Sequence, residues 1–142
     1  MRSLLATLVL VTGLAGRAAW ADDAVTPADQ AAIQRVIGDQ IEAFRHDDGE
    51  KAFGFAAPGT QHIFQDPGNF LAMVHRGYGV LVRPQSVIFG SLTSQNGQTL
   101  QQVQVVGADG TAAVAVYDME HEADGSWRIS GCSLLKSPLL QS

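Results

Sequence analysis

The chain has a single cysteine, Cys132, so it cannot form an intrachain disulfide and must depend on its hydrophobic core for stability. It also lacks a cluster of basic residues, because 9 Lys and Arg are scattered among 14 Asp and Glu, for a formal net charge of −5. Nucleic acids and anionic membrane surfaces both bind clustered positive charge. The sequence therefore predicts neither of them as a partner.

The apolar run near the start of the chain is too short to span a membrane. It covers residues 4–15, about a dozen residues where a spanning helix needs about 20. The basic start at 1–3 (Met-Arg-Ser), this short apolar segment and the Ala-Trp-Ala sequence at 19–21 are the three parts of a secretory signal peptide. We predict cleavage after Ala21. An uncleaved membrane anchor is the alternative, but Arg17 interrupts the apolar run too early to favour it.

Removal of residues 1–21 would leave one domain at residues 22–142, long enough to bury a single core. The loss of Arg2 and Arg17 would leave 7 basic residues against 14 acidic ones, a formal charge of −7. An exported protein without an intrachain disulfide fits the bacterial periplasm best. Cys132, on a predicted strand, is expected to be a small buried hydrophobic residue.

Helix signals fill the first half of this domain. Thr26 and Pro27 supply an N-cap and a first-turn proline, and apolar residues recur at helical spacing as far as Phe44. We predict a first helix from Pro27 to about His46. The expected elements that follow are a short helix at 50–56, a loop or extended stretch at 58–65, a third helix at 67–76 and a short strand at 78–82.

The second half predicts a three-stranded antiparallel meander. Its strands are separated by Asp109-Gly110 and Asp124-Gly125, dipeptides that are typical of tight hairpins. A further strand at 85–92 would join it through the turn at 94–97. The predicted meander strands are 99–107, 111–122 and 126–135.

Three-residue loops in both hairpins predict the strand register. Gln101 then lies opposite Tyr117, and His121 opposite Trp127. Further along the second hairpin, Tyr117 is expected opposite Gly131. The predicted inner face of the sheet comprises Val103, Val105, Ala113, Ala115, Tyr117, Met119, Trp127 and Ile129, and the outer face ends in a semi-apolar patch of Val114, Val116, Cys132 and Leu134.

Helices followed by an antiparallel sheet indicate an α+β fold, in which the N-terminal helices pack on the concave face of a curved meander. Several sequence stretches resemble an uncharacterised bacterial family, domain of unknown function 4864, within the nuclear transport factor 2-like (SnoaL-like) superfamily. The resemblance covers nearly all of residues 22–142 and implies a cone-shaped domain. Members of the superfamily include isomerases, dehydratases, cyclases and pure binding modules, so the fold does not choose an activity. The stretches that carry the resemblance are 40–48, 52–58, 70–78, 117–120 and 125–132.

Four residues of the predicted inner face are candidates for ligand binding: Gln101, Tyr117, His121 and Trp127. A pocket with apolar walls and a few polar groups is the usual form of a ligand site. The alternative is that Tyr117 and Trp127 simply fill the core, with their polar tips at its edge.

Candidate catalytic residues are few. His121 is a candidate general base, because histidine is the residue type suited to exchange protons near neutral pH, although its place near a turn favours a solvated or stacked histidine. Asp66 is a second candidate, although its position before Pro67 fits a helix N-cap better. The resemblance implies that an isomerase would need a tyrosine on the first helix and an inner-face aspartate, and neither is present.

The spacing of His, Cys, Asp and Glu matches no zinc or calcium motif, and no phosphate-binding or dinucleotide glycine fingerprint occurs. We therefore expect no metal and no cofactor. The leading hypothesis is an exported, non-enzymatic module that binds a small apolar ligand or a protein. The alternative is a small isomerase, dehydratase or hydrolase that acts in the wedge between sheet and helices. A homodimer through the outer sheet face is compatible with both.

Overall fold

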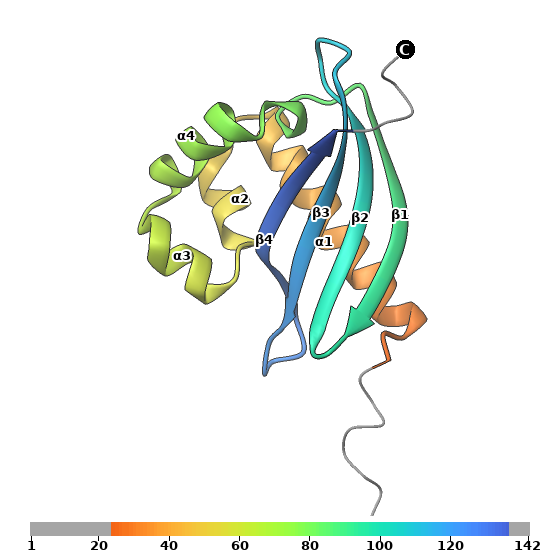
Figure 1. The fold of residues 1–142 in the computed structure, drawn as a ribbon. Coiled ribbons are helices and arrows are strands. Elements are labelled where there is room, and N and C mark those ends of the chain that lie inside the picture. Colours follow the sequence, from red (N-terminus) through yellow and green to blue (C-terminus); the bar gives the residue numbers. More distant parts are fainter. Residues whose placement is uncertain (1–23, 137–142) are drawn as a thin grey trace, which may run out of the picture.

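The computed structural model of the chain describes residues 24–136. It consists of a curved antiparallel sheet and a layer of helices that covers one face of the sheet and continues past one edge (Figure 1). The α+β class is therefore confirmed. The predicted signal peptide and its cleavage after Ala21 lie outside the described residues.

The first helix, α1 (Pro27–Arg45), begins where the sequence predicts and for the predicted reason. The Thr26 side chain accepts a hydrogen bond from the Asp29 backbone N–H, and the Asp29 carboxylate accepts one from the Thr26 N–H, both at 3.0 Å. This capping box satisfies two backbone donors that the first turn would leave unpaired. The helix crosses behind the sheet in Figure 1 and contacts β4 (Trp127–Lys136). Its buried stripe comprises Ile33, Ile37, Gln40, Ile41, Ala43 and Phe44.

Three further helices and one 3₁₀ turn complete the helical layer. Residues 58–65, predicted as a loop or extended stretch, contain a helix at 58–64, and residues 78–82, predicted as a strand, contain the 3₁₀ turn. The helix escaped prediction because its Ile63 and Phe64 are adjacent and form no periodic apolar stripe, and none of its residues is fully buried. A short apolar run such as 80–82 cannot distinguish strand from helix by its pattern. These elements are α2 (Gly49–Gly54), α3 (Pro58–Phe64), α4 (Pro67–Gly77) and η1 (Gly79–Leu81).

The sheet has the strand order β1-β2-β3-β4, with every neighbouring pair antiparallel. The predicted register of the β2–β3 hairpin is confirmed, because Gln101 lies opposite Tyr117 and Val103 opposite Ala115. All eight predicted inner-face residues are buried. The remaining strands are β1 (Ser86–Gln95), β2 (Gln98–Val106) and β3 (Ala112–His121).

The predicted register of the β3–β4 hairpin is correct near the turn and wrong beyond it. His121 lies opposite Trp127 as predicted, but Tyr117 lies opposite Cys132 instead of Gly131. The cause is a β-bulge at Ser130, whose hydroxyl donates to the Asp118 carbonyl oxygen at 3.0 Å. One inserted residue reverses the face of every side chain that follows it.

The bulge therefore overturns the predicted composition of the outer face. Cys132 and Leu134 turn inward and pack against the core, whereas Val114 and Val116 pair with Leu135 and Ser133 on the outer side. The predicted outer patch loses two of its four members and gains Leu135, which is 54% exposed.

The connection from α2 to α3 covers part of the β4 edge. The Ala57 N–H donates to the Ile129 carbonyl at 2.8 Å, and the Ile129 N–H donates to the Phe55 carbonyl at 2.9 Å. The Arg128 guanidinium also donates to the Gly54 carbonyl oxygen. Pairing of this kind protects an edge strand, and here it also places α3 and α4 beside the Tyr117 end of the inner face (Figure 1).

Candidate functional site

An apolar pocket of about 280 Å³ lies where α1, α3 and α4 meet the inner face of β3 and β4, and we call it the helix–sheet pocket. This volume is close to the lower end of the range for small-molecule sites. Most of its wall is hydrocarbon and aromatic ring. Its apolar lining comprises Phe44, Ala56, Ile63, Phe64, Phe70, Met73, Val74, Leu81, Ile129 and Gly131, and its polar or thiol lining comprises Gln40, Thr60, Tyr78, Tyr117, Ser130 and Cys132.

Phe70 is the centre of the aromatic wall. Its ring centroid lies 6.1 Å from that of Phe44, 5.5 Å from that of Phe53 and 5.7 Å from that of Phe64. Tilted and edge-on ring pairs at these separations are favourable. They hold α3 and α4 against α1 and so set the width of the pocket.

Helix α3 is also attached by polar contacts. The Thr60 hydroxyl donates to the Ser130 carbonyl at 3.0 Å, and the Gln61 amide donates to the Phe53 and Ala56 carbonyls at 3.0 and 3.1 Å. Ile63, which lines the pocket, is 74% exposed. An exposed isoleucine beside an apolar pocket marks α3 as its outer wall.

The polar groups of the pocket are neutral at physiological pH. Burial raises the pKa of both tyrosine hydroxyls, Tyr78 and Tyr117, and it raises the pKa of the Cys132 thiol to about 12. The residues that line the pocket, all of them in the described part of the chain, include no Asp, Glu, Lys, Arg or His. The pocket is therefore suited to uncharged groups.

Tyr117 is the predicted site residue that lies in this pocket. Its side chain is 1% exposed, and its hydroxyl has no hydrogen bond partner among residues 24–136. By contrast, the nearby Tyr78 hydroxyl donates to the Cys132 carbonyl at 2.7 Å.

Gln101 lies opposite Tyr117 but does not line the pocket. It is fully buried, and its side-chain amide donates to the Gly90 carbonyl at 3.1 Å and to the Gln102 carbonyl at 2.8 Å. The register of β1 shifts in this region, between Phe89 and Leu92. Gln101 therefore supports an irregular part of the sheet.

His121 and Trp127 lie together at the other end of the sheet, beside the start of α1. Their rings are stacked, with centroids 4.2 Å apart and an interplanar angle of 3°, as the stacked-histidine interpretation predicts. The Trp127 indole N–H donates to the Asp29 carboxylate at 3.3 Å, and His121 Nε2 lies 3.2 Å from the Gly125 carbonyl. The four predicted site residues therefore do not form one site.

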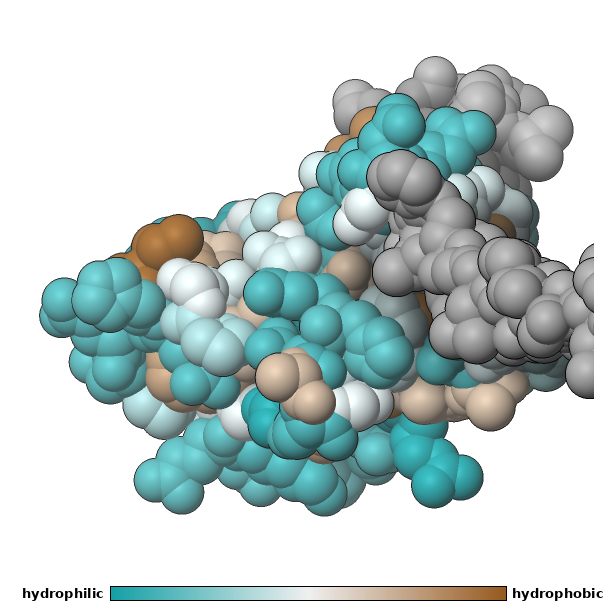
Figure 2. Space-filling model, turned by 90° about the horizontal axis from the view of Figure 1, so that it is seen from below, coloured by the Kyte–Doolittle hydropathy of each residue, from teal (hydrophilic) through white to brown (hydrophobic). Residues whose placement is uncertain are grey.

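The hollow beside Trp127 has a larger volume than the helix–sheet pocket, about 640 Å³, and its lining includes the acidic residues Asp29, Asp118 and Glu120. Figure 2 views this end of the molecule from below, where the surface of the described residues is mostly hydrophilic. Hydrogen bonds from the Thr26 backbone and hydroxyl are the main reason that the Asp29 pKa is lowered. The hollow suits solvent and polar groups.

Asp66 acts as the N-cap of α4. Its carboxylate accepts a hydrogen bond from the Asn69 backbone N–H at 2.8 Å and another from the Asn69 side-chain amide at 3.0 Å. Asp66 lines neither hollow. The N-cap interpretation of the sequence is confirmed.

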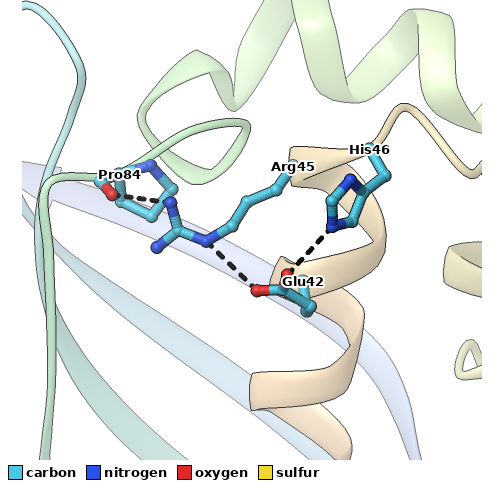
Figure 3. Close-up of polar contacts among 4 residues, drawn as sticks. All are labelled: Glu42, Arg45, His46 and Pro84. Atoms are coloured by element: carbon cyan, nitrogen blue, oxygen red, sulfur yellow. Dashed lines mark hydrogen bonds and ion pairs between the residues drawn. The ribbon is translucent and has the colours of Figure 1, made fainter.

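A polar cluster joins the C-terminal end of α1 to its neighbours (Figure 3). The Arg45 guanidinium donates to the Pro84 carbonyl at 2.9 Å and lies 3.4 Å from Glu42, while His46 lies 3.0 Å from the same carboxylate. Because these contacts join side chains at the end of α1 to one another and, through Arg45, to the Pro84 carbonyl, we interpret this cluster as structural. No group of three or more His, Cys, Asp and Glu in residues 24–136 is arranged to hold a metal ion.

Asp47, next to this cluster, has a φ of +51° and pairs with Arg83 at 2.8 Å and His75 at 3.0 Å. Hydrogen bonds from Arg83 and then His75 lower the Asp47 pKa. These pairs connect the end of α1 to α4 and to the segment before β1. They position the helices that enclose the pocket.

The match to a family model covers residues 26–141 and therefore all the elements described above. The chain belongs to the family described as Domain of unknown function (DUF4864). No curated protein and no solved structure matches it. The family resemblance seen in the sequence is confirmed, but the match itself carries no activity.

Sequence reasoning missed most of the pocket of this family member. Gln40 carried a usable signal, because it is a polar residue within the apolar stripe of α1. Its amide donates to the Ala52 carbonyl at 3.1 Å. For Cys132 the signal was Gly131, because an isolated glycine within a strand can mark a bulge, and the bulge at Ser130 turns Cys132 inward.

None of the described helices is long and apolar enough to cross a membrane.

Proposed function

We propose that this protein is a non-enzymatic binding module, exported to the bacterial periplasm, whose helix–sheet pocket holds a small, mainly apolar ligand. The observation that carries this proposal is the uncharged apolar lining around a volume of about 280 Å³. Pockets with hydrophobic walls and a few polar groups are the usual small-molecule sites.

Binding is favoured over catalysis by the ionisation of the pocket residues. A general base has to accept a proton near the working pH. The titratable groups that line the pocket are two tyrosines and a cysteine, and burial raises the pKa of each. His121 and Asp66, the candidate bases of the enzyme hypothesis, lie outside it.

We also propose that the domain has the cone-shaped fold of the nuclear transport factor 2-like superfamily, with the helices on the concave face. The support is the long α1, the short α2 and the curved four-stranded meander (Figure 1). In such a fold the space between helices and sheet is where a ligand would enter. The helix–sheet pocket occupies that space.

A homodimer through the outer sheet face is a second proposal. One cross-strand row on that face runs from Ile88 through Gln104 and Val114 to Leu135. Ile88 is 57% exposed and Leu135 is 54% exposed, so contact with a second copy would remove apolar surface from water. Sedimentation should give a dimer at micromolar concentration that Ile88→Lys with Leu135→Lys converts to a monomer. A monomeric wild type would contradict this proposal.

Native mass spectrometry of the protein isolated from the cells that produce it tests the binding function. We expect a mass that lacks residues 1–21 and an additional non-covalent mass that is lost on denaturation. Cys132→Phe should eliminate the additional mass, because the new ring occupies the pocket. The matched control is Val116→Phe, which adds the same ring to the outer face and should retain the ligand.

Two results would contradict the binding proposal. One is a wild-type protein that neither retains an additional mass nor takes up small apolar compounds in solution. The other is an additional mass that Cys132→Phe retains and Val116→Phe loses.

A further inference from the structure

The hydroxyl groups in the lining of the helix–sheet pocket differ in whether they have a hydrogen bond acceptor. Those of Thr60, Tyr78 and Ser130 each donate to a backbone carbonyl, at 3.0, 2.7 and 3.0 Å. The hydroxyl of Tyr117 has no partner among the described residues. Tyr117 is therefore the residue of the lining whose hydroxyl does not donate a hydrogen bond to a described residue.

Solvent does not satisfy this hydroxyl either, because less than 1 Å² of its oxygen is accessible. A buried donor without a partner is unfavourable, so a suitable acceptor would bind it with little competition from water. For a ligand in the pocket to contact this oxygen, the lining must shift slightly as the ligand enters.

The charge of the ligand follows from the same lining. A buried carboxylate or ammonium group requires an opposite charge or several hydrogen bonds. The lining of the pocket provides no charged side chain, and its hydroxyls other than Tyr117 are already donors to backbone carbonyls. The pocket thus selects against ions of either sign.

The volume limits the size of the ligand. A dry apolar cavity of about 150 Å³ binds benzene, and the helix–sheet pocket measures about 280 Å³. A bicyclic molecule, or a single ring with a short chain, is of the appropriate size.

We infer that the ligand is a neutral, compact and mainly apolar molecule with one hydrogen bond acceptor, such as a ketone or ester oxygen, that the Tyr117 hydroxyl binds. This inference rests on the proposed binding function and adds the chemical class of the ligand. Tyr117 selects the ligand, and the aromatic wall around Phe70 provides its apolar contacts.

Calorimetric titration with three probes that share the indane ring system tests the inference: indane, 1-indanone and indane-1-carboxylate at pH 8. The wild-type protein should bind 1-indanone about fivefold more tightly than indane, because one net hydrogen bond is gained. The carboxylate should bind at least about 100-fold more weakly than the ketone.

Two variants assign the preference to one hydroxyl. Tyr117→Phe should bind the ketone and the hydrocarbon equally, whereas the matched control Tyr78→Phe, which also removes a hydroxyl from the lining, should keep the fivefold preference. Thermal unfolding should show that Tyr117→Phe is folded and at least as stable as wild type, because it removes an unsatisfied buried group.

The outcomes separate this inference from the binding function. If none of the three probes binds, the proposed binding function fails for this ligand size, and the inference fails with it. If indane and 1-indanone bind the wild type equally, the function stands and the role of Tyr117 is overturned, whatever the variants do. Carboxylate binding as tight as that of the ketone would overturn the neutral class.

Discussion

The two ends of the inner sheet face contrast sharply, although Tyr117 and Trp127 are aromatic residues on the same face of neighbouring strands. At the Trp127 end, the indole N–H binds Asp29, the histidine ring stacks on the indole, and the adjacent hollow is lined by charged residues. At the Tyr117 end the hydroxyl has no partner among the described residues, and no charged residue lines the adjacent pocket.

The difference arises from the helical layer. The first turn of α1 reaches the Trp127 end with a carboxylate, and the capping box that holds Asp29 also orients it toward the indole. At the Tyr117 end, the layer is made of α3 and α4, which bring aromatic and aliphatic side chains. The Trp127 indole N–H therefore has an acceptor at one end, whereas the Tyr117 hydroxyl has no partner among the described residues at the other.

The largest effect is expected for Trp127→Ala, which should lower the free energy of unfolding by about 3–5 kcal/mol because it removes a buried indole. Urea unfolding followed by circular dichroism measures this change. Tyr117→Phe, which removes only the hydroxyl without a partner at the other end, should change the same quantity by less than about 1 kcal/mol. A loss of several kcal/mol in Tyr117→Phe would mean that this hydroxyl is satisfied in the folded protein.

The reactivity of the Cys132 thiol tests whether the Tyr117 end of the inner face is shielded from water. Because burial raises its pKa to about 12 from the ordinary value of 9.0, the native thiol should react with iodoacetamide at pH 8 about 100-fold or more slowly than it does in urea, since the thiolate is the nucleophile. Labelling rates followed by mass spectrometry measure the ratio. A native rate close to that of the unfolded chain would show that the pocket does not exclude water.

A smaller effect is expected for Asp66→Ala, which removes the N-cap of α4 and should cost about 1 kcal/mol of stability. Since α4 supplies pocket wall, the variant should also bind 1-indanone more weakly, while the fluorescence of the Trp127 end stays unchanged. Asp66→Asn keeps a capping oxygen and serves as the control. Loss of binding in both variants would indicate that the carboxylate itself, and not the cap, matters to the pocket.

The smallest effect concerns the Trp127 end and pH. In the folded protein the pKa of Asp29 lies below its ordinary value of 3.8. The carboxylate therefore stabilises the fold above about pH 4, and this contribution is lost as the pH falls through the folded pKa. Asp29→Asn should therefore show a shallower loss of stability below pH 4, by less than about 1 kcal/mol. Urea midpoints between pH 2.5 and 6 measure this difference, and identical pH profiles would contradict it.

Much of the fold is predictable from local signals in the sequence. The capping residues before α1 and α4, the stripe of α1 and the Asp-Gly turns predict their elements, because each acts within a few neighbouring residues. The same signals place Gln101 opposite Tyr117 and His121 opposite Trp127, and both pairs are confirmed. They failed for α3, which has no stripe of its own and is attached to the sheet by the hydrogen bond from Thr60 to the distant Ser130 carbonyl.

The sequence alone determines the α+β class, the family and the inner face of the sheet near the turns, because hydrophobic period and turn chemistry are local properties. The site was decided by tertiary structure. The bulge at Ser130 turns Cys132 inward, and the α2–α3 connection pairs with β4 and brings α3 and α4 beside Tyr117. Both depend on hydrogen bonds between segments that meet only in the folded chain, and the hydrophobic period of a single segment does not encode them.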